Sequence, residues 1–177
     1  MAKWIIDPDH SVAAFSIRHM MIASVRGQFS NIAGTIHFDP AHIARSSVDM
    51  KIEVASITTG IRKRDDHLLS PDFFDAAHFP LITFKSTSVE PIGGSQGRVS
   101  GDLTIHGITR PVTFDAEYYG PVNDPFGEGV SMGFSASLTI NREDYGITWN
   151  QAMEAGGVMV GREVELFIDL EADRADG

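Results

Sequence analysis

The stretch from Met132 to Ile140, MGFSASLTI, carries an apolar residue at every second position, ending at Leu138 and Ile140. Glycine, serine and threonine occupy the positions between them. Because successive side chains of a β-strand point to opposite faces, this alternation predicts a strand with one buried face and one exposed face.

The same period of two recurs along most of the chain. It is regular in residues 48–54, 99–105, 112–118 and 164–170, and less regular in residues 10–19, 25–38 and 81–90. Turn-forming pairs such as Asp39-Pro40 and Gly93-Gly94 separate these segments. We therefore predict an all-β fold, an extended lipocalin-like antiparallel barrel of about eight strands, because closure removes exposed edges. A two-sheet sandwich would give nearly the same alternation.

One region, residues 60–80, departs from the strand pattern. Ser70 followed by Pro71 is typical of a helix start, with serine as the cap and proline in the first turn. We expect one or two short helices here, as an insertion into the barrel. No linker or change of composition divides the chain, so residues 1–177 are predicted to form a single domain.

Composition and charge narrow the functional classes. The 177 residues include 14 Lys and Arg against 24 Asp and Glu, a formal net charge of -10, which disfavours nucleic acid as a partner. No apolar run approaches the roughly 20 residues of a transmembrane helix. The first apolar stretch ends at Asp7-Pro8, too early for a secretory signal, so a cytoplasmic location is expected.

Motifs for catalysis or metal binding are missing from the sequence. There are no cysteines, no phosphate-binding loop and no nucleophile elbow, and the seven histidines form no pair at helix or strand spacing. We therefore predict no metal site. The run from Arg62 to His67 is interpreted as a solvated helix face, or alternatively as a contact for a ligand headgroup at the barrel mouth. Arg18-His19 fits a strand end or a headgroup contact equally well.

Large flexible apolar side chains are abundant, with 7 Met and 11 Phe. Methionine adapts to ligands of variable shape, although an ordinary core would also use these residues.

Several segments, taken in order, resemble the YceI-like family of polyisoprenoid-binding proteins. The matching segments cover nearly the whole chain: Trp4 to Ser11, Phe15 to Met21, Val25 to Phe29, Gly34 to Ile36, Arg64 to Leu68, Asp72 to Asp75, Phe79 to Ser86, Gly101 to Val112, Arg142 to Gly146 and Val164 to Leu170.

The resemblance implies a barrel with a short helical insertion, often dimeric, that holds an amphiphilic isoprenoid in a tunnel. Many relatives are periplasmic and carry a signal peptide, from which this chain departs. The implied function is to carry or store a long-chain apolar lipid, a polyisoprenoid or isoprenoid quinone. From the same resemblance we expect a non-enzymatic homodimer with no cofactor beyond that lipid. Candidate ligand-binding residues are Phe15, Ile17, Arg18, His19, Met20, Phe29, Met50, Asp65, His67, Leu68, Phe73, Phe74, Phe84, Leu103, Ile105, His106, Phe114, Met132, Phe134, Leu138 and Trp149.

Two other functional classes remain open at this point. The chain could be an enzyme acting on an isoprenoid-like small molecule, with Asp65, His67 and His106 as acid–base groups that meet in a pocket. It could instead bind a macromolecule through an exposed apolar patch away from the barrel mouth. A barrel interior packed solid with Phe and Met side chains would contradict the lipid-binding hypothesis.

Overall fold

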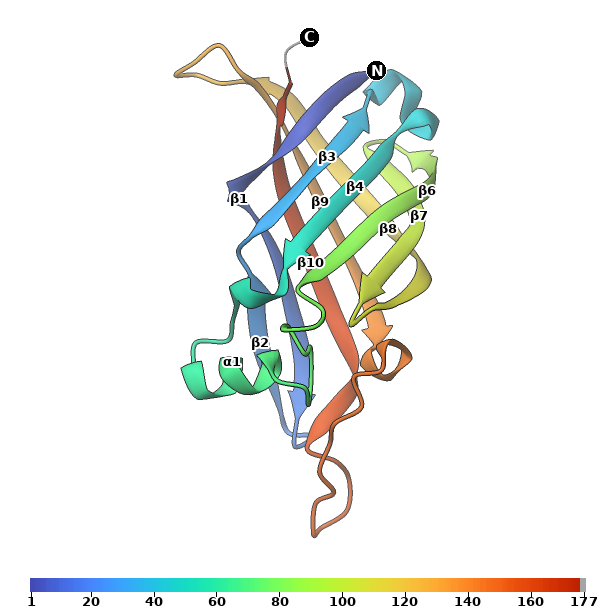
Figure 1. The fold of residues 1–177 in the computed structure, drawn as a ribbon. Coiled ribbons are helices and arrows are strands. Elements are labelled where there is room, and N and C mark those ends of the chain that lie inside the picture. The colour runs from blue at the N-terminus through green and yellow to red at the C-terminus, as the bar shows by residue number, and fades with distance from the viewer. Residues whose placement is uncertain (176–177) are drawn as a thin grey trace.

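The alternating segments pair into one continuous antiparallel sheet in the computed structural model, which describes residues 1–175 (Figure 1). Its strands are β1 (Ala2–His19), β2 (Ala23–Phe29), β3 (Ile32–Phe38), β4 (Ser47–Glu53), β5 (Ile57–Thr58), β6 (Leu81–Gly93), β7 (Gln96–Ile105), β8 (Ile108–Asn123), β9 (Val130–Asn141) and β10 (Val160–Arg174). The helices are α1 (Arg62–Leu69) and the 3-10 turns η1 (Pro40–Arg45), η2 (Val54–Ser56) and η3 (Arg142–Tyr145). The last two residues of the predicted domain lie outside the described part.

The sheet closes on itself because β10 pairs with both β9 and β1. The closed circuit runs β1-β3-β4-β6-β7-β8-β9-β10, and β2 and β5 extend it beside the second half of β1. The predicted eight-stranded lipocalin-like barrel is confirmed, and the sandwich alternative is wrong because no free edge separates two sheets in this circuit. Within residues 1–175 no helix is long and apolar enough to cross a membrane.

Residues 25–38, predicted as one strand, form two strands, β2 and β3. The chain leaves β2 at Ser30, and the backbone N–H of Asn31 donates to Ser56 Oγ at 3.1 Å. Phe29 and Ile32 are three positions apart and both buried. In one continuous strand they would face opposite sides, so the set of inward-facing positions changes from odd to even between β2 and β3. The apolar residues of the sequence show this change of alternation, which could have indicated that the strand ends near Ser30.

The prediction that Ser70-Pro71 starts a helix is also wrong. α1 begins at Arg62, and Ser70 caps its C-terminus, with its backbone N–H and hydroxyl both donating to the His67 carbonyl. Proline directly after a C-cap is common because it cannot continue the helix. At the other end, Asp65 accepts hydrogen bonds from the backbone and hydroxyl of Thr59, which ties the first turns of α1 to the end of β5.

One end of the barrel is filled by side chains. Trp4, Ile6, Met132 and Ala172 are each at most 3% exposed, and the Trp4 indole N–H donates to the Phe38 carbonyl at 3.1 Å. The opposite end, where β1 turns into β2, carries α1 and the segment that leads into β10 (Figure 1). The end of the barrel near the N-terminus is therefore packed with side chains, whereas the opposite end is covered by α1 and the segment that leads into β10.

Glycine permits close aromatic packing in the barrel wall. Gly27 on β2 lies opposite Phe15 on β1, and a Cβ at Gly27 would come 2.4 Å from the Phe15 ring. We expect Gly27→Ala to lower the free energy of unfolding by about 2 kcal/mol through overpacking, as measured by urea denaturation. Gly97→Ala is the control, because its Cβ would meet nothing closer than 3.5 Å. Equal stability of the two variants would contradict this reading of the packing.

Candidate functional site: an apolar cavity inside the barrel

The barrel encloses a cavity of about 360 Å³. Every strand of the closed circuit contributes lining residues, and most of them are aliphatic or aromatic. Along β10 the lining positions run from Val160 to Leu170, about 33 Å of strand at 3.3 Å per residue. The volume lies within the range of about 300–1,000 Å³ that is usual for small-molecule sites. The interior is not packed solid.

Most of the predicted ligand-binding residues line this cavity. They are Phe15, Ile17, Arg18, His19, Phe29, Met50, His67, Leu68, Phe73, Phe74, Phe84, Leu103, Ile105, Phe114, Phe134, Leu138 and Trp149. The alternation of inward and outward positions explains the agreement, because each of the strand residues in this set lies on the inward face of its strand or at a strand end.

Four predicted residues lie outside the cavity. Met20 occupies the turn between β1 and β2 and is 37% exposed, whereas Met132 is buried in the filled end of the barrel, paired with Ala172. The Asp65 carboxylate is engaged with Thr59. His106 lies in the β7–β8 turn, where Nδ1 is 3.1 Å from the Tyr145 carbonyl and the ring packs on Phe79. Turn geometry and local hydrogen bonds keep Met20, Asp65 and His106 out of the cavity, whereas Met132 packs into the core at the filled end of the barrel.

Basic side chains gather at the α1 end of the cavity. Arg18 and His19 lie at the end of β1, Arg64 and His67 lie on α1, and Arg142 lies on η3; all five line the cavity. The carboxylate that lines it, Glu117 on β8, is bound by the hydroxyls of Ser95 and Tyr119 away from this cluster. The charged lining is thus mainly cationic although the chain carries a net charge of -10.

Arg18 and His19, which are neighbours in sequence, both line the cavity at the end of β1. The register between β1 and β10 shifts between Ile17, opposite Val164, and His19, opposite Val160. Strict alternation with Ile17 and His19 facing inward would send Arg18 outward. β10 has two more residues than β1 between these two pairs, so the regular pairing of β1 with β10 is interrupted where Arg18 lies.

Arg142 also lines the cavity, although it is not among the ligand-binding residues predicted from the sequence. It is only 4% exposed, and its guanidinium donates to four backbone carbonyls: Nε to Gly161 at 2.7 Å, Nη1 to Ile147 and Trp149 at 2.9 Å each, and Nη2 to Val160 at 3.3 Å. Within residues 1–175 no carboxylate forms an ion pair with it. Burial accordingly lowers the pKa of Arg142, and it raises the pKa of the neighbouring Tyr145.

Aromatic rings surround His67 where α1 meets the cavity. The imidazole lies edge-on to Phe73 and Trp149, with ring centroids 5.0 and 4.9 Å away, and its Nε2 is 2.7 Å from Asp72 Oδ2. Asp72 orients the ring, while Phe73 and Trp149 also line the cavity. A polar group is therefore held at the rim of an otherwise apolar space.

The three residues considered for acid–base chemistry each have a different partner. Asp65 bonds to Thr59, His67 to Asp72 and His106 to the Tyr145 carbonyl. Of the three, His67 is the one that lines the cavity. In the described residues they do not bond to one another, so the convergence that the enzyme hypothesis requires is missing from this arrangement.

Comparison with known proteins gives consistent matches across the chain. Residues 4–172 match the YceI-like domain family. A UPF0312 protein of Staphylococcus aureus (strain MSSA476) is 39% identical over 171 residues, 97% of each chain. The crystal structure of Burkholderia cenocepacia BcnA superposes with a TM-score of 0.82 at 27% identity, covering 94% of this chain and 98% of that one.

Two further solved structures share the fold. The Campylobacter jejuni YceI protein has a TM-score of 0.74 and 31% identity, with 90% of both chains covered. A polyisoprenoid binding domain from Saccharophagus degradans has a TM-score of 0.68 at 16% identity, with 99% of both chains covered, which is a likeness of fold.

Proposed function

Because this chain belongs to the YceI-like domain family, we propose that it binds a long-chain amphiphilic lipid, a polyisoprenoid or isoprenoid quinone, inside its barrel and carries or stores it. The observation that supports this most directly is the apolar cavity of about 360 Å³, lined by every strand of the barrel. The fold neighbour from Saccharophagus degradans is described as polyisoprenoid-binding, in agreement with such a ligand.

Hydrophobic burial supplies enough free energy for this function. Each buried methylene contributes about 0.8 kcal/mol, so some twenty carbons give about 16 kcal/mol before the cost of ordering the chain. That gross value is close to the largest non-covalent affinities known. The apolar wall can therefore hold the tail unaided, and the polar lining residues are left to set the orientation of the lipid.

The basic cluster at the α1 end suits an oxygen-rich headgroup. Arg18, His19 and His67 can donate hydrogen bonds to phosphate, carboxylate or quinone oxygens. The Arg142 guanidinium already donates four hydrogen bonds to backbone carbonyls, so it would attract the headgroup chiefly through its positive charge. We propose that the tail lies along the barrel and the headgroup lies beside Arg18.

Extraction of the purified full chain with organic solvent, followed by mass spectrometry, tests the function. We expect one long-chain isoprenoid lipid at up to one molecule per chain, and rebinding after delipidation. Recovery of no lipid, together with failure of the delipidated protein to bind isoprenoids, would contradict the proposal. The homodimer and the cytoplasmic location stay predictions, and light scattering of the purified protein tests the first of them.

Arg18→Gln tests the headgroup position. Loss of one charged donor should weaken binding of an isoprenoid monophosphate of about twenty carbons by about fivefold, and leave the corresponding alcohol nearly unchanged. Arg26→Gln is the matched control, since it removes the same charge from the exposed face of β2, outside the cavity. Equal effects of the two substitutions on the monophosphate would place the headgroup elsewhere.

A further inference from the structure

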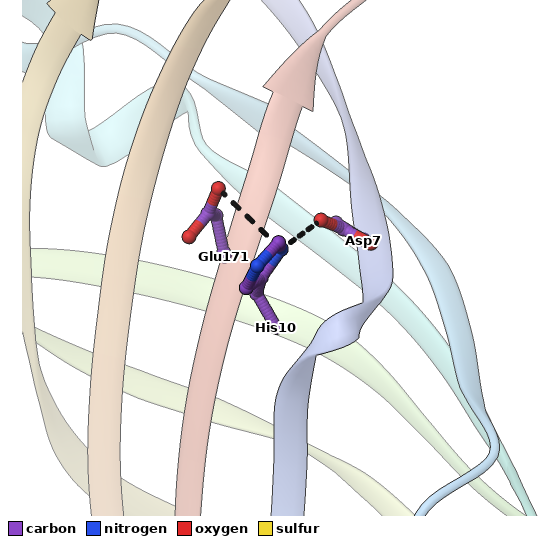
Figure 2. A group of neighbouring side chains, drawn as sticks. All are labelled: Asp7, His10 and Glu171. Carbon is purple, nitrogen blue, oxygen red and sulfur yellow. Dashed lines mark hydrogen bonds and ion pairs between the residues drawn. The ribbon is translucent and has the colours of Figure 1, made fainter. Parts of the chain in front are cut away.

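β1 is interrupted near its middle, on the outside of the barrel. Asp7 pairs with Glu171 of β10, but the next paired residue, Val12, lies opposite Asp169, so β1 gains residues relative to β10. Pro8 falls in this gap and has no N–H to donate to the ladder. The chain bends here and brings His10 back beside Asp7 and across from Glu171 (Figure 2).

Three potential ligand atoms converge at this bend. His10 Nδ1 is 2.6 Å from Asp7 Oδ2 and 4.0 Å from Glu171 Oε1, and all three atoms lie within 4.8 Å of one another. Ligand atoms bound about 2.1 Å from a tetrahedral ion are about 3.4 Å apart. The two observed distances lie on either side of that value, so small side-chain rotations would place all three atoms around one ion.

The surroundings are suited to a cation. The hollow beside the three residues is also lined by Asp124, Asp169 and Asp173, and no lysine or arginine lines it among the described residues. Clustered negative charge raises the local concentration of cations. The exposed side chain of His10 leaves room for water to complete a coordination shell.

We propose that Asp7, His10 and Glu171 bind a divalent transition-metal ion such as Zn²⁺ on the seam between β1 and β10. One imidazole nitrogen with two carboxylate oxygens is a donor set that favours such ions over Mg²⁺ or Ca²⁺, which bind through oxygen alone. The ion would link the two strands whose pairing closes the barrel. The site lies outside the cavity, so this inference does not depend on the lipid.

The chain contains its own comparison for this site. Asp39 and His42 have the same spacing as Asp7 and His10, with Nδ1 3.0 Å from Asp39 Oδ2. Within residues 1–175 that pair is not part of a group of three potential ligands, whereas the pair at the seam is joined by Glu171. The third carboxylate, contributed by β10, is therefore what distinguishes a metal site from an ordinary Asp–His pair.

Titration of the full chain with ZnCl₂ by calorimetry, with Co²⁺ absorption as a second readout, tests the proposal. We expect one Zn²⁺ per chain at the seam, with at least tenfold weaker binding in both His10→Ala and Glu171→Gln. His42→Ala should bind as the unmodified chain does. Zn²⁺ at about one hundred times its Kd should also raise the Tm by several degrees, and this rise should vanish in Glu171→Gln.

Glu171→Gln keeps the shape of the side chain and guards against misfolding of His10→Ala. If Glu171→Gln binds Zn²⁺ as tightly as the unmodified chain, the seam holds an Asp–His pair only, and the proposal is overturned. The same conclusion follows if His10→Ala and His42→Ala weaken binding equally. Because the apolar cavity is untouched by these substitutions, lipid binding should be unchanged in all of them.

Discussion

Replacement of Arg142 by methionine should lower the free energy of unfolding by about 3–5 kcal/mol. Methionine keeps an apolar stem of similar length but leaves the carbonyls of Ile147, Trp149 and Gly161 without the donors they now have. Each buried polar group left without a partner costs about 1–3 kcal/mol. The carbonyls of Ile147 and Trp149 belong to the segment between η3 and β10, and that of Gly161 belongs to the start of β10. Arg142 therefore fastens this segment and the start of β10 to the end of β9.

Urea denaturation followed by circular dichroism measures this effect. Arg162→Met is the matched control, because the Arg162 side chain is 69% exposed and pairs with Glu143 at 3.4 Å; we expect a change of at most about 0.5 kcal/mol there. Arg142→Lys should fall between the two, since an ammonium cannot reach carbonyls on several sides as a planar guanidinium does. A loss below about 1 kcal/mol in Arg142→Met would show that solvent or a rearranged loop satisfies those carbonyls.

The role of Arg142 shows where sequence reasoning reaches its limit. Strand alternation identifies inward positions such as Phe15 and Phe134, because a period of two is a property of neighbouring residues. The acceptors of Arg142 lie 5 to 19 positions away, in the irregular segment after η3 and at the start of β10, and no local pattern encodes that arrangement. In the sequence, Arg142 belongs to the segment from Arg142 to Gly146 that resembles the YceI-like family, but that resemblance assigned no role to it.

The same reasoning explains the other differences between expectation and structure. Arg18 and His19 were both predicted as ligand contacts, and both line the cavity although strict alternation would send neighbours to opposite faces. The outer Asp7–His10–Glu171 group joins residues about as far apart as the chain allows. A search for closely spaced histidine pairs could not find it, because β1 and β10 become neighbours only when the barrel closes.

Replacement of Ala136 by tryptophan should weaken lipid binding by about a hundredfold. Ala136 lines the cavity from β9, opposite Ala116 on β8 and Ile168 on β10. The indole would take the place of about four lipid methylenes, a loss of about 3 kcal/mol at 0.8 kcal/mol each. Because the cavity offers free volume, the variant should fold without loss of stability, with a Tm equal to or above that of the unmodified chain.

Ser137→Trp separates cavity filling from general damage to the strand. Ser137 is the next residue of β9 and is exposed on the outer face, so its tryptophan adds the same side chain outside the barrel. We expect the delipidated Ser137→Trp protein to bind a fluorescent isoprenoid as the unmodified chain does, and Ala136→Trp to bind it about a hundredfold more weakly. If Ala136→Trp folds and binds with unchanged affinity, the lipid does not occupy the barrel interior, and the apolar cavity has another use.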